Sequence, residues 1–204
     1  NVFNDTTHVV NNGTDLRIGP VTSGANYFNS LVAFSGIDTV DLCYHSRCFF
    51  ANDVEFNGPT RFGYGATSSA PRSAIFHGSL AQHIRGTTTV TPVIRNLQID
   101  KTAADVLLDI PISVSHNLSL TSGNIDLNRH TLTLTSPTVA ITGGGSGSYV
   151  MSEAVDNSSR LNWELGNVGS GSFRFPFGAN ISGTDYFIPA TFSVTAAGVP
   201  VGSG

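Results

Sequence analysis

Residues 117–142 read NLSLTSGNIDLNRHTLTLTSPTVAIT. Within this stretch, apolar residues recur in pairs whose members are two positions apart, and each pair begins seven positions after the previous one. The four pairs are Leu118/Leu120, Ile125/Leu127, Leu132/Leu134 and Val139/Ile141. Spacing of i, i+2 is typical of a strand with one buried face, and the intervening Ser, Thr, Asn and Asp residues favour strands and turns. The stretch therefore predicts short β-strands with two inward side chains each.

Strands of this kind can form either an antiparallel meander or the successive faces of a solenoid coil. A meander prefers two-residue turns such as Asn-Gly, whereas the corners of a solenoid tolerate varied residues. The turns here are varied, namely Ser122-Gly123, Asn128-Arg129-His130 and Ser136-Pro137. The sequence therefore predicts an all-β chain with a β-solenoid (parallel β-helix-like) module over residues 1–142.

The same pattern extends upstream, and it changes downstream. Inward positions are predicted at Ile94, Leu97, Ile99, Val106, Leu108, Ile110 and Val114. The Gly/Ser run at 143–148 is predicted to be a linker or a corner within one fold. Residues 149–204 are predicted to form a strand-rich cap or the start of a second β domain. There, Trp163 is expected to fill the core, and segments 173–178 and 186–194 are expected to pair as strands.

The composition is that of an extracellular β protein. Of the 204 residues, 40% are hydrophobic and only 12% are charged. The net charge of −4 is spread along the chain, which disfavours nucleic acid as a partner. The single lysine, Lys101, is predicted to lie in an exposed corner. No apolar run is long enough for a membrane-spanning helix, and a secretion signal is expected upstream of Asn1.

The two cysteines, Cys43 and Cys48, are five positions apart, a spacing that a tight loop or a strand-turn-strand can close as a disulfide. Two free buried thiols are the alternative. Zinc binding is not expected, because a structural zinc site needs four ligands and no second Cys or His pair follows at a suitable spacing.

An enzyme on such a scaffold would need clustered carboxylates. The candidate groups are Asp38/Asp41, Asp53/Glu55 and Asp100/Asp105/Asp109. Turn residues that bond their own backbone are the more common use of aspartate at corners, so no catalytic residue and no cofactor is expected. The alternative is a domain that binds or cleaves carbohydrate, with Trp163, Tyr149, Tyr186 and Phe187 as a stacking platform. Ice binding by an outward row at Thr131, Thr133 and Thr135 is a weaker hypothesis.

Several motifs resemble a pattern of giant secreted surface proteins of Bacteroidetes. They are Gln82-His83-Ile84-Arg85-Gly86, Ile94-Arg95-Asn96-Leu97-Gln98-Ile99, the Leu/Thr-rich run that ends at Leu134, Ser148-Tyr149-Val150 and Phe173-Arg174-Phe175-Pro176-Phe177-Gly178. Many proteins of that group are adhesin-like substrates of type IX secretion. The resemblance implies a structural or adhesive module at the cell surface, of a kind that can be repeated or assembled into a filament. Its expected partners are neighbouring domains, copies of the same protein, glycans or surfaces.

The resemblance also implies glycosylation. Asp5-Thr6-Thr7 and Asp38-Thr39-Val40 fit the short motif for O-glycosylation in that group, which makes Thr6 and Thr39 the candidate sites.

Overall fold

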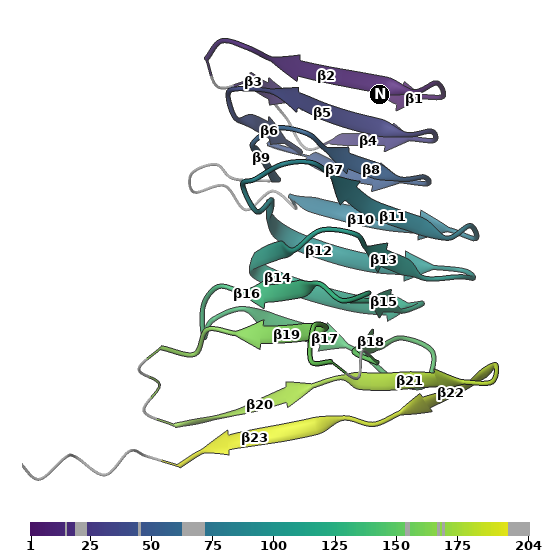
Figure 1. Ribbon diagram of the computed structural model, residues 1–204, viewed down its shortest axis with the longest axis vertical. Coiled ribbons are helices and arrows are strands. Elements are labelled where there is room, and N and C mark those ends of the chain that lie inside the picture. Colours follow the sequence, from purple (N-terminus) through teal and green to yellow (C-terminus); the bar gives the residue numbers. More distant parts are fainter. Residues whose placement is uncertain are drawn as a thin grey trace, which may run out of the picture.

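The computed structural model describes residues 1–14, 16–18, 24–44, 46–62, 72–153, 156–166, 168 and 170–195. All regular elements among them are β-strands, and most pair in parallel with the strand one coil away, so that the chain winds into a column of about 7 turns (Figure 1). The β-solenoid prediction is therefore confirmed. No helix in these ranges is long and apolar enough to cross a membrane.

The column has three parallel faces. The first face contains β3 (Leu16–Ile18), β6 (Val40–Leu42), β9 (Thr60–Phe62), the start of β12 (Val93–Lys101), the start of β14 (Ile112–Ser122), β16 (Thr131–Leu134) and β19 (Arg160–Trp163). The second contains β1 (Val2–Phe3), β4 (Gly24–Phe28), β7 (Ser46–Phe50), β10 (Ser73–Gly78), the ends of β12 and β14, and β17 (Ala140–Gly143). The pairing of β12 with β14 shifts register between Ile94 and Asn96, where the chain passes from one face to the next.

The third face is a separate sheet. Its parallel strands are β2 (Thr7–Asn11), β5 (Val32–Gly36), β8 (Val54–Phe56), β11 (Gln82–Gly86), β13 (Val106–Leu108), β15 (Ile125–Asp126), β18 (Val150–Met151) and β21 (Phe177–Ile181). Because β18 pairs with both β15 and β21, this sheet continues past the Gly/Ser run. The run itself lies at the corner between β17 and β18.

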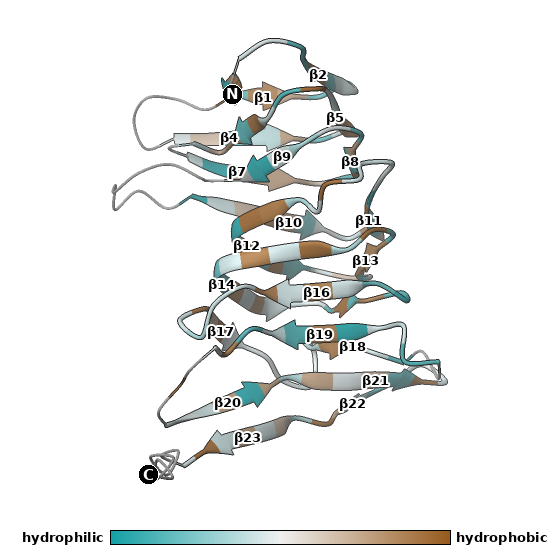
Figure 2. Cartoon of the chain, turned by 60° about the vertical axis from the view of Figure 1, so that its left-hand side comes forward, coloured by the Kyte–Doolittle hydropathy of each residue, from teal (hydrophilic) through white to brown (hydrophobic). Residues whose placement is uncertain are grey.

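The seven-residue spacing separates inward pairs on successive faces of the column; it is not the length of one full coil. Leu118 and Leu120 lie on the second face, Ile125 on the third, Leu132 and Leu134 on the first, and Ile141 again on the second. All the predicted inward residues between Ile94 and Val139 are buried. Figure 2 shows hydrophobic and more hydrophilic residues following one another within single strands of the column. In the second half of β12, the buried Leu97, Ile99 and Lys101 alternate with the half-buried Gln98 and Asp100, because successive side chains of a strand point to opposite faces.

Aromatic side chains stack along the inside of the second face. The ring centroids of Phe3 and Phe28 are 4.8 Å apart, those of Phe28 and Phe50 are 5.2 Å apart, and those of Phe50 and Phe76 are 5.3 Å apart. These separations follow the spacing of neighbouring strands, about 4.8 Å, because each ring occupies the same register position one coil further on. The core is therefore a continuous ladder that runs along the column.

The predicted disulfide is present. Cys43, in the turn after β6, is bonded to Cys48 in β7, with their Cα atoms 5.7 Å apart. Both residues are fully buried in the core. The bond therefore joins the first face to the second inside one coil.

The chain reverses direction at its C-terminal end. After β20 (Gly171–Phe175) and β21, a two-residue turn at Ser182 and Gly183 leads into β22 (Thr184–Phe187), which runs antiparallel to β21. Both turn residues have positive φ, as two-residue hairpins with primed turns require. β23 (Ala190–Val194) then runs antiparallel to β20, so the segments expected to pair do so.

Trp163 is half-buried and packs against the core. Its ring contacts those of Phe173 and Phe175 edge-on, at centroid distances of 5.1 and 5.5 Å, and its Nε1 donates to the Ser136 carbonyl at 3.0 Å. This tryptophan links the last coil of the first face to the reversed strands.

Candidate functional site

The predicted acidic groups do not come together in one cleft. Asp41 is buried on the first face, in register with Arg17 and Arg61 of the adjacent coils. Asp53 and Glu55 lie on the outer surface of the third face, where their carboxylates are 3.1 and 3.4 Å from the Arg85 guanidinium one coil away. Because this arginine pairs with both carboxylates, the three side chains form a surface ladder.

Asp109 belongs to the same surface. Its Oδ2 lies 2.7 Å from Nδ1 of His83, and its Oδ1 accepts a hydrogen bond from Nδ2 of Asn128 at 2.8 Å. Asp100 lies on the second face and accepts a hydrogen bond from Ser122 Oγ at 3.1 Å. Asp105 is separated from both, because it lies at the corner between the second and third faces.

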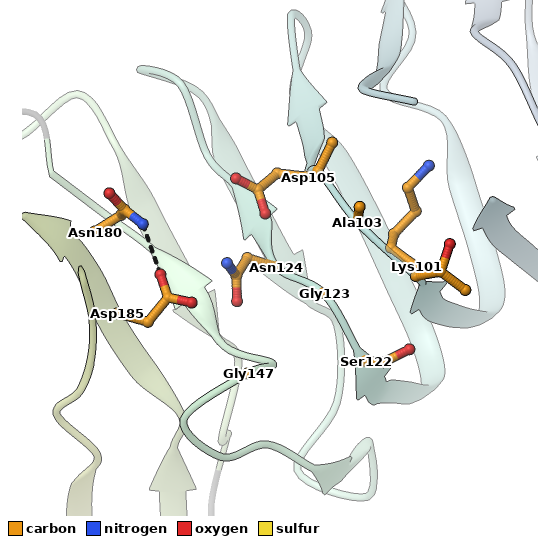
Figure 3. A pocket seen from close by; sticks show the side chains of 11 residues that line it. Lys101, Ala103, Asp105, Ser122, Gly123, Asn124, Gly147, Asn180 and Asp185 are labelled. Atoms are coloured by element: carbon orange, nitrogen blue, oxygen red, sulfur yellow. Dashed lines mark hydrogen bonds between the residues drawn. The ribbon is translucent and has the colours of Figure 1, made fainter. Parts of the chain in front are cut away.

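A polar recess lies at this corner because consecutive coils have corners of unequal length. Four residues separate β12 from β13, two separate β14 from β15, and six separate β17 from β18. The short corner at Gly123 and Asn124 is therefore set back between two longer ones. The result is a cavity of about 420 Å³ (Figure 3). Its lining residues are Lys101, Thr102, Ala103, Ala104, Asp105, Ser122, Gly123, Asn124, Gly147, Asn180 and Asp185. This cavity is the corner recess.

The prediction that Lys101 is exposed is wrong. The residue is 2% exposed, and its ammonium group donates to the carbonyl oxygens of His77 and Leu80 and to Oε1 of Gln82, at 3.3, 2.6 and 2.5 Å. Figure 3 shows the ammonium group pointing away from the other side chains of the recess. Burial lowers the pKa of Lys101 to about 8, and Asp105 opposes this effect. Lys101 can be buried because oxygen atoms of the neighbouring coil accept the hydrogen bonds of its ammonium group.

Tyr149, which is fully buried, supports the recess from behind its lining residue Asp185. Its hydroxyl donates to Oδ1 of Asp185 at 2.7 Å, and Nδ2 of Asn180 donates to the same oxygen at 2.7 Å. Burial raises the pKa of the Tyr149 hydroxyl, and the neighbouring Asp185 carboxylate raises it further, so this group remains a donor at neutral pH. The two donors hold the Asp185 carboxylate at the edge of the recess.

Asn124 and Asp105 complete the recess. The Oδ1 atom of Asn124 accepts the backbone N–H of Tyr149 at 3.1 Å, whereas its Nδ2 donates to no acceptor among the described residues. Within the same part of the chain, the Asp105 carboxylate has neither a hydrogen-bond partner nor an ion pair. Both side chains point toward Asp185 in Figure 3. The recess therefore has an unpaired donor, the Asn124 amide nitrogen, between the carboxylates of Asp105 and Asp185.

Sequence reasoning found only part of this site. It singled out Asp105 as acidic, and it placed Lys101 at the same corner. It gave no role to Asn124, Asn180 or Asp185. A period-two pattern contains no signal for them, because Asn124 lies in a corner whereas Asn180 and Asp185 face each other in the β21–β22 hairpin, and these two segments meet only when the coils stack.

The two candidate glycosylation sites differ in accessibility. Thr6 lies in the exposed turn between β1 and β2. Thr39 is half-buried, and its carbonyl oxygen accepts hydrogen bonds from the Leu16 N–H and Asn11 Nδ2 at 3.2 and 2.8 Å. Glycosylation at either residue stays a prediction, with Thr6 the more open to an enzyme.

The threonines considered for ice binding lie on the first face. Thr133 is in register with Ser113 on one side and Asn162 on the other, so the row across neighbouring coils is mixed. Of the aromatic residues considered for stacking on sugars, Tyr149 is buried and Trp163 packs inward, while Tyr186 is exposed.

Comparison of the chain with known protein families, with characterised proteins and with solved structures finds no match.

Proposed function

We propose that this chain is a structural and adhesive module of a large secreted bacterial surface protein, and that it stacks end to end with neighbouring domains or copies. The supporting observation is the continuity of its core. The aromatic ladder reaches the first coil, where Phe3 rests on Phe28 and is only half-buried. A coil added at this end would extend the ladder without any change in geometry, as solenoid units do.

Exposed apolar side chains at both ends support stacking. At the N-terminal end, Val10 in the outermost strand of the third face is 57% exposed. At the other end, Phe192 in β23 is 56% exposed, and Ile188 and Tyr186 beside it are exposed as well. Unpaired strand edges with apolar side chains favour further strand pairing. The two ends of the column are therefore the surfaces that we assign to the partners.

The chemistry of the chain favours a location outside the cell. A buried disulfide persists in oxidising compartments, and the Cys43–Cys48 bond is of this kind. The low charged fraction and the many small polar side chains also favour a location outside the cell. The secreted location and the relation to adhesin-like surface proteins belong to this proposal.

Substitution on the outermost strand tests the stacking. The Thr7 N–H donates to the Leu31 carbonyl at 2.9 Å, and N–H groups alternate along a strand, so the Val10 N–H points to the open edge. Val10→Pro removes that donor and leaves the pairing of β2 with β5 intact. We expect wild type to form rods at high concentration in sedimentation velocity and electron microscopy, and Val10→Pro to remain monomeric.

Val10→Thr is the matched control, because it keeps both the N–H and the branched side chain. It should assemble as wild type does. If the wild-type chain stays monomeric at every concentration, stacking between copies is contradicted.

A further inference from the structure

The corner recess has a donor and acceptor pattern that its own residues leave unused. Its volume of about 420 Å³ lies within the roughly 300–1,000 Å³ typical of small-molecule sites. Asn124 is 7% exposed, yet its amide nitrogen donates to no described acceptor. Because Asn124 lines the cavity, its free amide nitrogen is available to donate to a ligand there.

The acceptors stand on either side of that donor. The Asp105 carboxylate has no partner among the described residues, and Asp185 uses only Oδ1 to accept from Tyr149 and Asn180. An ionised carboxylate only accepts hydrogen bonds, and an amide nitrogen only donates them. A hydroxyl group does both, so adjacent hydroxyls can accept from Asn124 and donate to Asp105 and Asp185.

A divalent cation fits this recess less well. Calcium takes six to eight oxygen ligands. The two amide oxygens at the recess are already engaged, since Asn124 Oδ1 accepts from the Tyr149 N–H and Asn180 Oδ1 accepts from the Gly183 N–H at 3.1 Å. The Asn124 amide nitrogen would in addition point its hydrogens toward the ion.

An anionic ligand fits poorly as well. The one cationic residue that lines the recess is Lys101, whose ammonium group donates to three oxygens outside the recess. The two carboxylates would therefore repel a uronic or sialic acid without compensation.

We propose that the corner recess binds a neutral pyranose through adjacent hydroxyl groups, with Asn124 as donor and Asp105 and Asp185 as acceptors. This site is distinct from the ends of the column, and it does not depend on stacking. It would give the module a contact to glycans on its side.

The probes are the methyl glycosides of mannose, galactose, glucose and N-acetylglucosamine, and binding is followed through backbone amide shifts in NMR titrations of the full chain. We expect at least one probe to bind with a Kd on the order of 1 mM, as weak single-sugar sites do, with shifts centred on 102–105 and 123–124.

Asp105→Asn removes an acceptor without a change in shape, and Asn124→Asp removes the donor while keeping Oδ1. Both should weaken binding about tenfold or more.

Asp109→Asn is the matched control, because it makes the same chemical change on the third face and should leave binding unchanged. Absence of binding by all four glycosides overturns the proposal, as does binding that both recess variants retain. Methyl glucuronide binding as tightly as its neutral counterpart, or calcium chloride producing the shifts in place of the sugars, overturns it too. The Val10→Pro variant should bind the sugar normally, which separates this result from the test of stacking.

Discussion

At the scale of the residue, glycines at the corners let successive coils approach each other closely. Gly86, the last residue of β11, has φ +151, and a Cβ placed there would lie 1.8 Å from the Phe56 carbonyl oxygen. Gly36 and Gly143 stand in the same relation to Asn11 and Leu120, at 2.0 and 2.1 Å. No rotamer relieves such an overlap, because the obstacle is backbone. These glycines are therefore required by the spacing of the coils.

The expected result is that Gly86→Ala lowers the free energy of unfolding by about 1–3 kcal/mol, the range of backbone strain. Gly13→Ala is the control, since a Cβ at Gly13 meets nothing within 4 Å. It should change stability by less than about 1 kcal/mol. Guanidinium unfolding measures both, and equal effects would refute the assignment of Gly86 as a close-approach position.

At the scale of the element, one side chain ties strands of neighbouring coils together. Lys101 ends β12 and donates to the carbonyl oxygens of His77 in β10 and of Leu80 in the turn before β11. Gln82 in β11 completes the link, because its Nε2 donates to the carbonyls of Phe50 and Asn52 at 2.8 and 2.9 Å while its Oε1 accepts from Lys101. This buried chain of hydrogen bonds connects three coils at one corner.

This link makes stability depend on pH. The pKa of Lys101 is about 8 in the folded chain and about 10.4 when unfolded. Between these values the unfolded chain binds a proton that the folded chain does not, so stability rises with pH. We expect the stability of wild type relative to Lys101→Met to increase by about 2 kcal/mol from pH 8 to pH 10. Urea unfolding at several pH values measures this difference, and parallel pH profiles would show that Lys101 keeps its ordinary pKa.

At the scale of the whole molecule, each coil is held mainly by its two neighbours. The long strands β12 and β14 lie in the middle of the column and pair with each other across two faces. β2 at one end and β22 at the other each pair with a single strand. Stability in such a column depends on interfaces between neighbours, so it should fall toward the ends.

Hydrogen exchange followed by mass spectrometry tests this gradient. Peptides that cover β12 and β14 should exchange slowest, and those that cover β2 and β22 should exchange fastest, because end coils open locally without global unfolding. Uniform protection along the chain would contradict a stack of neighbour-dependent coils.

The sequence alone predicted the strands and their inward side chains, and it favoured the disulfide over two free thiols. These are local properties: side chains alternate along a strand, as in Leu132 and Leu134, and Cys43 and Cys48 are only five positions apart. Only the tertiary structure decided which coils stack, where the chain reverses at β22, that Lys101 is buried, and that Asn124 meets Asp105 and Asp185. The physical reason is that these outcomes depend on the lengths of corners in different coils, which bring distant residues to one level of the column.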